Sequence, residues 1–137
     1  MRDLARYEVL TRAKDLAVDS YGLTTLLPDS ERFGLTAQIN RASVSVAANI
    51  AEGLGRGTAG DLERHLRIAL GSAAELYVLL EIADRVHHLP PQDLAQFGAN
   101  TTVVRKQLNR LIGQVAGDRQ LHGSRPPETG GEPAANQ

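Results

Sequence analysis

An uninterrupted apolar repeat between residues 59 and 86 constrains the fold more than any other feature of the sequence. Its members recur at alternating intervals of four and three: Leu62, Leu66, Ala69, Ala73, Leu76, Leu80 and Ala83. Such intervals place every member on one face of an α-helix, as in helical bundles and coiled coils. We therefore predict a helix over residues 59–86, preceded by a capping box made by Thr58 and Asp61.

Three further segments show the same spacing and predict three more helices. The first covers residues 3–27 and ends before Pro28, because the residue preceding a proline avoids helical geometry. The second begins after a cap at Asp29 or Ser30 and ends at the glycines of residues 53–57. The last of the three, which is the fourth helix in chain order, begins at Gln92 or Asp93 and extends to residue 116.

Together these segments predict an all-α fold, an up-down-up-down antiparallel four-helix bundle formed by residues 1–116. The chain has only two phenylalanines, three tyrosines and no tryptophan. Its core must therefore consist of Leu, Ile, Val and Ala, which suits closely packed helices. Residues 117–137 are rich in Gly, Pro and polar residues, and they predict a disordered C-terminal tail.

Charge and cysteine content restrict the possible functions. Fifteen basic and sixteen acidic residues give a net charge of −1, which argues against a simple electrostatic nucleic-acid binder but leaves room for a local basic face. The chain has no cysteine, so disulfides, thiolate metal sites and cysteine nucleophiles are excluded. The charged N-terminal segment does not resemble a signal peptide, and no apolar run is long enough to span a membrane. We expect a cytoplasmic protein without a membrane partner.

A set of polar residues occupies helical positions where apolar residues are expected. Its members are Arg41, Asn49, Glu52, Arg56 and Glu75. One interpretation is a pair of carboxylates for acid–base chemistry. The interpretation that we favour is a buried polar network that fixes helix register and subunit contacts. In this network we expect Glu75 to form an ion pair with Arg41, so that Glu75→Ala lowers the free energy of unfolding by about 3–5 kcal/mol.

Metal and phosphate sites find little support in the sequence. A di-iron bundle needs Glu-x-x-His motifs, and the nearest approach is Asp84-x-x-His87 at a helix end. We interpret His87 and His88 as cations near the negative end of the helix dipole. The glycine-rich residues 53–57 predict a tight turn between helices, with a phosphate contact through Arg56 as the alternative. We expect no catalytic residue, no metal and no cofactor.

The fourth segment carries a clear charge asymmetry. Between residues 94 and 116 it has three basic residues, Arg105, Lys106 and Arg110, and no acidic one. A solvated helix face explains this pattern. The alternative is a nucleic-acid-binding face, which a ring of subunits would repeat as a basic belt.

Two stretches of the sequence resemble a known family. ERFGLTAQINRASVSVAANIAEGLGR (residues 31–56) and DLERHLRIALGSAAEL (residues 61–76) are similar to the four-helix bundle proteins encoded by intervening sequences of 23S rRNA genes. The resemblance covers about residues 5–115, and the chain departs from it at Ala47, where relatives often have proline, and at His65, where they often have an aromatic residue. The family implies a ring, typically a pentamer. A related protein is the accessory factor of diversity-generating retroelements, which binds reverse transcriptase and nucleic acid through a basic surface.

These observations favour a non-enzymatic interaction or scaffold protein that forms a homo-oligomeric ring, with the pentamer taken from the resemblance. The first and third segments each carry a second apolar stripe, which a single antiparallel neighbour would leave uncovered. The alternative is a nucleic-acid-binding accessory protein that acts with a reverse transcriptase or ribosomal RNA.

Overall fold

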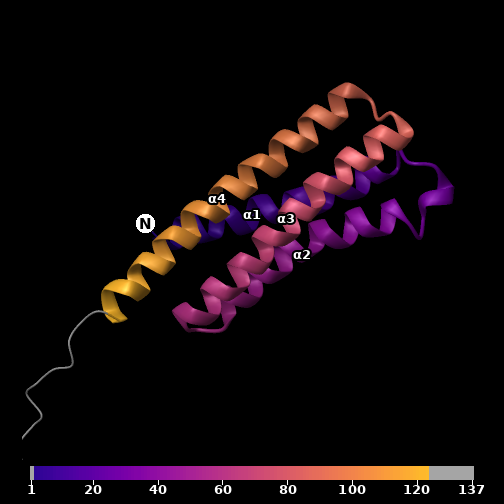
Figure 1. The fold of residues 1–137 in the computed structure, drawn as a ribbon. Coiled ribbons are helices and arrows are strands. Elements are labelled where there is room, and N and C mark those ends of the chain that lie inside the picture. The colour runs from indigo at the N-terminus through magenta and orange to yellow at the C-terminus, as the bar shows by residue number, and fades with distance from the viewer. Residues whose placement is uncertain (1, 124–137) are drawn as a thin grey trace, which may run out of the picture.

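The structure, a computed structural model, describes residues 2–123, and helices account for most of them (Figure 1). The elements are α1 (Arg2–Thr24), a short 3₁₀ turn η1 (Asp29–Glu31), α2 (Leu35–Gly55), α3 (Ala59–His87) and α4 (Pro91–Gly123). The described residues contain no strand, so the all-α prediction is confirmed.

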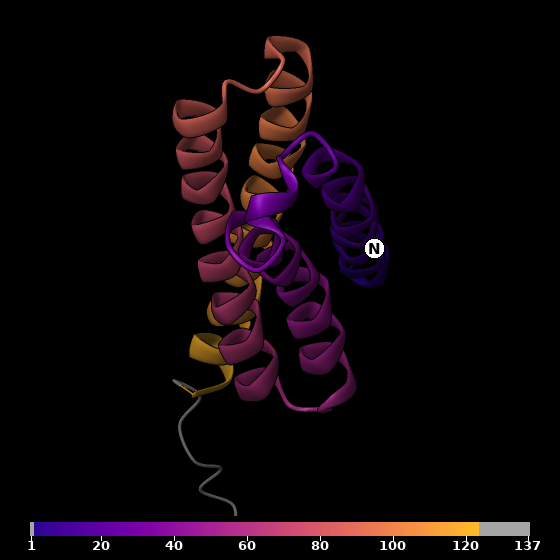
Figure 2. The ribbon, with the colours of Figure 1, turned by 90° about the vertical axis from the view of Figure 1, so that its right-hand side faces the viewer.

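The four helices form an up-down-up-down bundle. Each helix packs against the next one in the chain, and α4 returns to pack against α1 (Figures 1 and 2). The α1–α2 and α3–α4 connections therefore lie at one end of the bundle, and the α2–α3 connection lies at the other. The groove between α2 and α3 and the groove between α1 and α4 consequently lie on opposite sides of the molecule.

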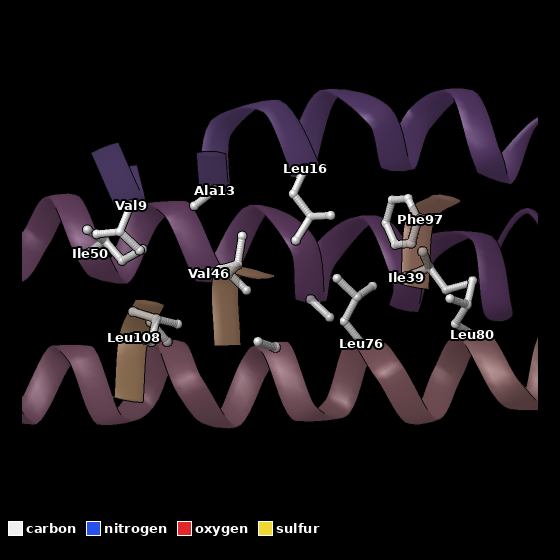
Figure 3. Close-up of a cluster of buried hydrophobic side chains, with 14 of the residues drawn as sticks. Val9, Ala13, Leu16, Ile39, Val46, Ile50, Leu76, Leu80, Phe97 and Leu108 are labelled. Carbon is white, nitrogen blue, oxygen red and sulfur yellow. The ribbon is translucent and has the colours of Figure 1, made fainter. Parts of the chain in front are cut away.

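The core follows the apolar repeat of the sequence closely. All seven members of the α3 repeat, from Leu62 to Ala83, are buried. The corresponding stripe of α1 (Val9, Ala13, Leu16, Ser20 and Leu23) is buried as well, and side chains from all four helices meet at the centre (Figure 3). At about 25 cal/mol for each Å² of apolar surface removed from water, this contiguous core is the main source of stability.

The C-terminal boundary that we predicted is wrong. Helix α4 does not end at residue 116 but continues to Gly123, so residues 117–123 are helical. Arg119 explains the extension, because its Nη1 donates to Glu63 Oε1 at 2.8 Å and so ties this segment of α4 to α3. The remainder of the predicted tail, residues 124–137, lies outside the described residues.

The start of α2 also differs from the prediction. Asp29 and Ser30 do not cap it; they belong to the 3₁₀ turn η1, and α2 begins at Leu35. Glu31 supplies the cap from outside the helix, since its Oε1 accepts the Leu35 backbone N–H at 3.2 Å. By contrast, the Thr58 half of the predicted capping box forms: Thr58 Oγ1 accepts the backbone N–H of Asp61 at 3.2 Å.

Candidate interaction surfaces

The polar residues of α2 and α3 form local contacts rather than one network. Ser45 Oγ lies 2.9 Å from Ser72 Oγ, which joins the two helices. Asn49 donates to the backbone oxygen of Ser45 at 2.9 Å and lies 3.1 Å from its hydroxyl. Glu52 pairs with Arg56 at 2.9 Å, one turn further along the chain, and both side chains are half-exposed. Exposed pairs of this kind contribute about 0.3–0.5 kcal/mol.

The buried ion pair expected between Glu75 and Arg41 is not formed. Both side chains are exposed, and neither forms an ion pair within residues 2–123. They line the same hollow between α2 and α3, next to the Ser45–Ser72 contact. The short side chains of Ser45 and Ser72 make the contact between the two helices here. The long charged side chains of Arg41 and Glu75 remain in solvent. Their position therefore gives no sign of acid–base chemistry.

Gly53, in the NIAEG sequence that the family resemblance singled out, lets α2 and α3 approach closely. A Cβ atom at this position would lie 2.9 Å from His65 Cβ and 3.2 Å from Leu62 Cδ1. His65 itself is buried, and its Nδ1 donates to the backbone oxygen of Asp61 at 2.8 Å. Both Gly53 and His65 therefore have a structural explanation in helix packing.

A buried polar cluster that we did not predict lies between α1 and α2. Ser20 Oγ lies 2.6 Å from Ser43 Oγ and 3.0 Å from Asn40 Oδ1, which also accepts a hydrogen bond from Thr24 at 3.3 Å. Hydroxyls at positions 20 and 24 of the apolar stripe were the available signal. The cluster contains no base, so it serves to satisfy buried polar groups and fix the register of the two helices.

A side-chain hydrogen bond joins the end of α3 to the α1–α2 connection. His87 Nε2 lies 2.7 Å from Glu31 Oε2, and both side chains are about one-fifth exposed, at 21% and 22%. This hydrogen bond, assisted by the Leu35 N–H, lowers the pKa of Glu31 below its ordinary value. His88 ends α3 in the left-handed conformation, with φ of 57°.

The three basic residues of α4 differ in their surroundings. Arg105 is half-buried, and its guanidinium carbon lies 5.6 Å from the centre of the Tyr77 ring, within range of a cation–π interaction. Lys106 and Arg110 are exposed, lie one helical turn apart and form no ion pair with a described carboxylate. The basic face is thus reduced to two free cations beside one that is held against α3.

Groupings typical of metal chemistry are absent from the part of the chain that the structure describes. No three His, Asp or Glu side chains there converge on a point that suits a metal ion.

At the glycine-rich turn of residues 53–57, Gly57 has φ of 85°, and Arg56 forms an ion pair with Glu52. None of the helices within residues 2–123 is apolar over a length sufficient to cross a membrane.

Apolar side chains remain exposed on two opposite sides of the bundle. On the α2–α3 side, Phe33 lines the hollow between the two helices, and Ile68 is exposed one turn before Ser72. The α1–α4 side carries Val18, Leu26 and Val103, which line hollows between these two helices. Exposed apolar surface of this kind marks protein–protein contact sites.

The fold and these surfaces define a class: an antiparallel four-helix bundle whose interior polar groups serve packing and whose open apolar surfaces lie on its flanks. The chain belongs to the family of 23S rRNA-intervening sequence proteins, whose sequence model matches residues 5–110. Among solved structures it is similar to a protein of unknown function from the S23 ribosomal protein family of Bacteroides thetaiotaomicron. The two share 25% identity with a TM-score of 0.74, over 80% of this chain and 98% of that one. A comparison with curated proteins finds no significant match.

Proposed function

We propose that the chain is a non-enzymatic, ring-forming interaction protein whose working surface is created by assembly. The observation that carries this proposal is the exposed apolar side chains that line hollows on two opposite sides of the bundle: Phe33 between α2 and α3, and Val18, Leu26 and Val103 between α1 and α4. The two surfaces differ in residues and shape. Contacts between unlike surfaces are heterologous, and they close into a ring when the rotation between copies permits.

The interior of the bundle supports a structural role. The buried polar residues Ser20, Thr24, Ser43, His65 and Thr101 each form hydrogen bonds within the bundle. A pentamer is the ring size that the family resemblance favours.

Native mass spectrometry combined with light scattering tests the proposal. We expect one predominant species whose mass is a fixed multiple of the 14.7 kDa chain. A chain that stays monomeric over the full concentration range of the experiment contradicts it.

A second function, nucleic-acid binding, is favoured by the exposed Lys106 and Arg110 on α4. In a ring these cations recur in every copy, which concentrates positive charge although the chain carries a net charge of −1. Protein purified without nuclease is then expected to carry nucleic acid, visible in its ultraviolet absorbance. Changing Arg105, Lys106 and Arg110 to glutamate should abolish the binding. Binding that persists in the triple variant at low salt places the contact elsewhere.

A further inference from the structure

One aromatic side chain projects from the bundle far into solvent. Phe33 lies in the connection between η1 and α2, and it is 87% exposed, the highest value among the large apolar side chains described. The Arg32 guanidinium carbon lies 5.3 Å from the centre of its ring. Arg32 forms no ion pair with a carboxylate of residues 2–123. The projection thus combines an apolar ring with a free positive charge.

A hollow of about 400 Å³ lies between the last turns of α1 and the first turns of α4. Leu23 and Phe97, both buried, contribute to its lining, and the exposed Val18 and Leu26 border it. Gly22 forms part of the wall, and a Cβ atom there would meet nothing within 4 Å, so the packing of the chain itself does not require a glycine.

The hollow also carries negative charge. Asp19 and Asp93 line it from α1 and α4, and both are exposed. In the described part of the chain neither carboxylate forms an ion pair. An apolar interior with two free carboxylates is complementary in both chemistry and charge to Phe33 with Arg32.

Projection and hollow lie at the same end of the bundle. The His87–Glu31 pair, at 2.7 Å, holds the η1 segment against the end of α3, where the connection to α4 begins. They nevertheless face different sides, because Phe33 lines the α2–α3 groove and the hollow belongs to the α1–α4 side. In a ring, copies related by rotation about an axis parallel to the helices touch at equal height through two different sides. Phe33 and the hollow satisfy both conditions.

We infer that Phe33 of one copy inserts into the α1–α4 hollow of the next copy. Its ring packs against Phe97, and Arg32 reaches Asp19 and Asp93. A buried aromatic anchor with a neighbouring arginine is a common energetic centre of protein interfaces. This inference rests on the proposed ring, and it adds which surfaces join and which side chains hold them.

Cysteine cross-linking tests the contact directly, because the natural chain has no cysteine. Two single variants, Ser30→Cys beside the projection and Gln96→Cys beside the hollow, keep Phe33 and Arg32 intact, and both positions are exposed. When the two variants are mixed and treated with a short bis-maleimide, we expect cross-linked dimers that contain one copy of each. The matched control pairs Gln96→Cys with Ala59→Cys, an exposed position at the opposite end of the bundle, and should give none.

Filling the hollow provides a second readout. Gly22→Leu adds a side chain to its wall without a clash inside the chain, and we expect the dissociation constant of the assembly to rise by at least about tenfold. Gly113→Leu is the matched control, since Gly113 is another exposed glycine with open space, on α4 near the other end. Circular dichroism should show unchanged helix content in both variants.

The outcomes separate this inference from the proposed function. Mixed cross-links together with a weakened Gly22→Leu assembly support the inserted Phe33. If the wild-type chain assembles but Ser30→Cys cross-links only to itself, or Gly22→Leu assembles as tightly as Gly113→Leu, the insertion is overturned and the ring remains supported. A wild-type chain that never associates overturns both.

Discussion

Replacing Gly53 by alanine tests whether close helix approach explains the glycine of the NIAEG sequence. The added Cβ would lie 2.9 Å from His65 Cβ and 3.4 Å from Leu62 Cα. Relaxed carbon contacts are about 3.5–4.0 Å. Neither neighbour is the far end of a flexible side chain, so α2 and α3 must move apart.

The expected magnitude combines two opposing effects. Overpacking a close contact costs about 1–3 kcal/mol. Replacing glycine by alanine within a helix returns up to about 1 kcal/mol. We therefore expect Gly53→Ala to lower the free energy of unfolding by about 1–2 kcal/mol.

Gly71→Ala provides the matched control. Gly71 lies inside α3, and a Cβ atom there would meet nothing within 4 Å, so only the gain in helix propensity remains. Urea unfolding followed by circular dichroism measures both variants, at one protein concentration because association shifts apparent stability. If Gly53→Ala proves as stable as Gly71→Ala, the close-approach explanation is wrong.

Three further predictions follow from the side-chain contacts. Glu75→Ala should change the free energy of unfolding by less than about 0.5 kcal/mol in the monomer, because the side chain is exposed and unpaired; a loss above about 3 kcal/mol would restore a buried pair. The pKa of Glu31 is lowered because the fold stabilises its ionised carboxylate. This contribution to stability is fully present above the ordinary glutamate pKa of about 4.3, and it is lost as the pH falls through the lowered pKa. Glu31→Gln and His87→Ala should therefore both weaken the dependence of the melting temperature on pH in that acid range, and an unchanged dependence contradicts the pair. Glu63→Gln should speed amide hydrogen exchange in residues 117–123, because it removes the carboxylate that Arg119 contacts at 2.8 Å; unchanged exchange means that other contacts hold this segment.

The candidate site was predictable only in part. Asn49 contacts Ser45, and Glu52 contacts Arg56, each four residues apart, so these contacts were accessible from the sequence, although we predicted one buried network instead. Pairing between Arg41 and Glu75 depended on how closely α2 approaches α3 at that level, which the spacing does not give. The Ser20–Ser43 contact and the Phe33 projection were missed for the same reason: each depends on where a neighbouring helix or connection lies.

What the sequence alone determined was the number of helices and which face of each is buried. The 3–4 apolar rhythm requires this, because burial of one face is the main driving force for a helix in water, and every member of the α3 repeat is indeed in the core. Only the tertiary structure decided where α4 ends. Residues 117–123 have few apolar side chains, and they contact α3 through the ion pair between Arg119 and Glu63. The tertiary structure also decided which polar residues meet, because short-range spacing fixes a residue's face but not the distance to the next helix.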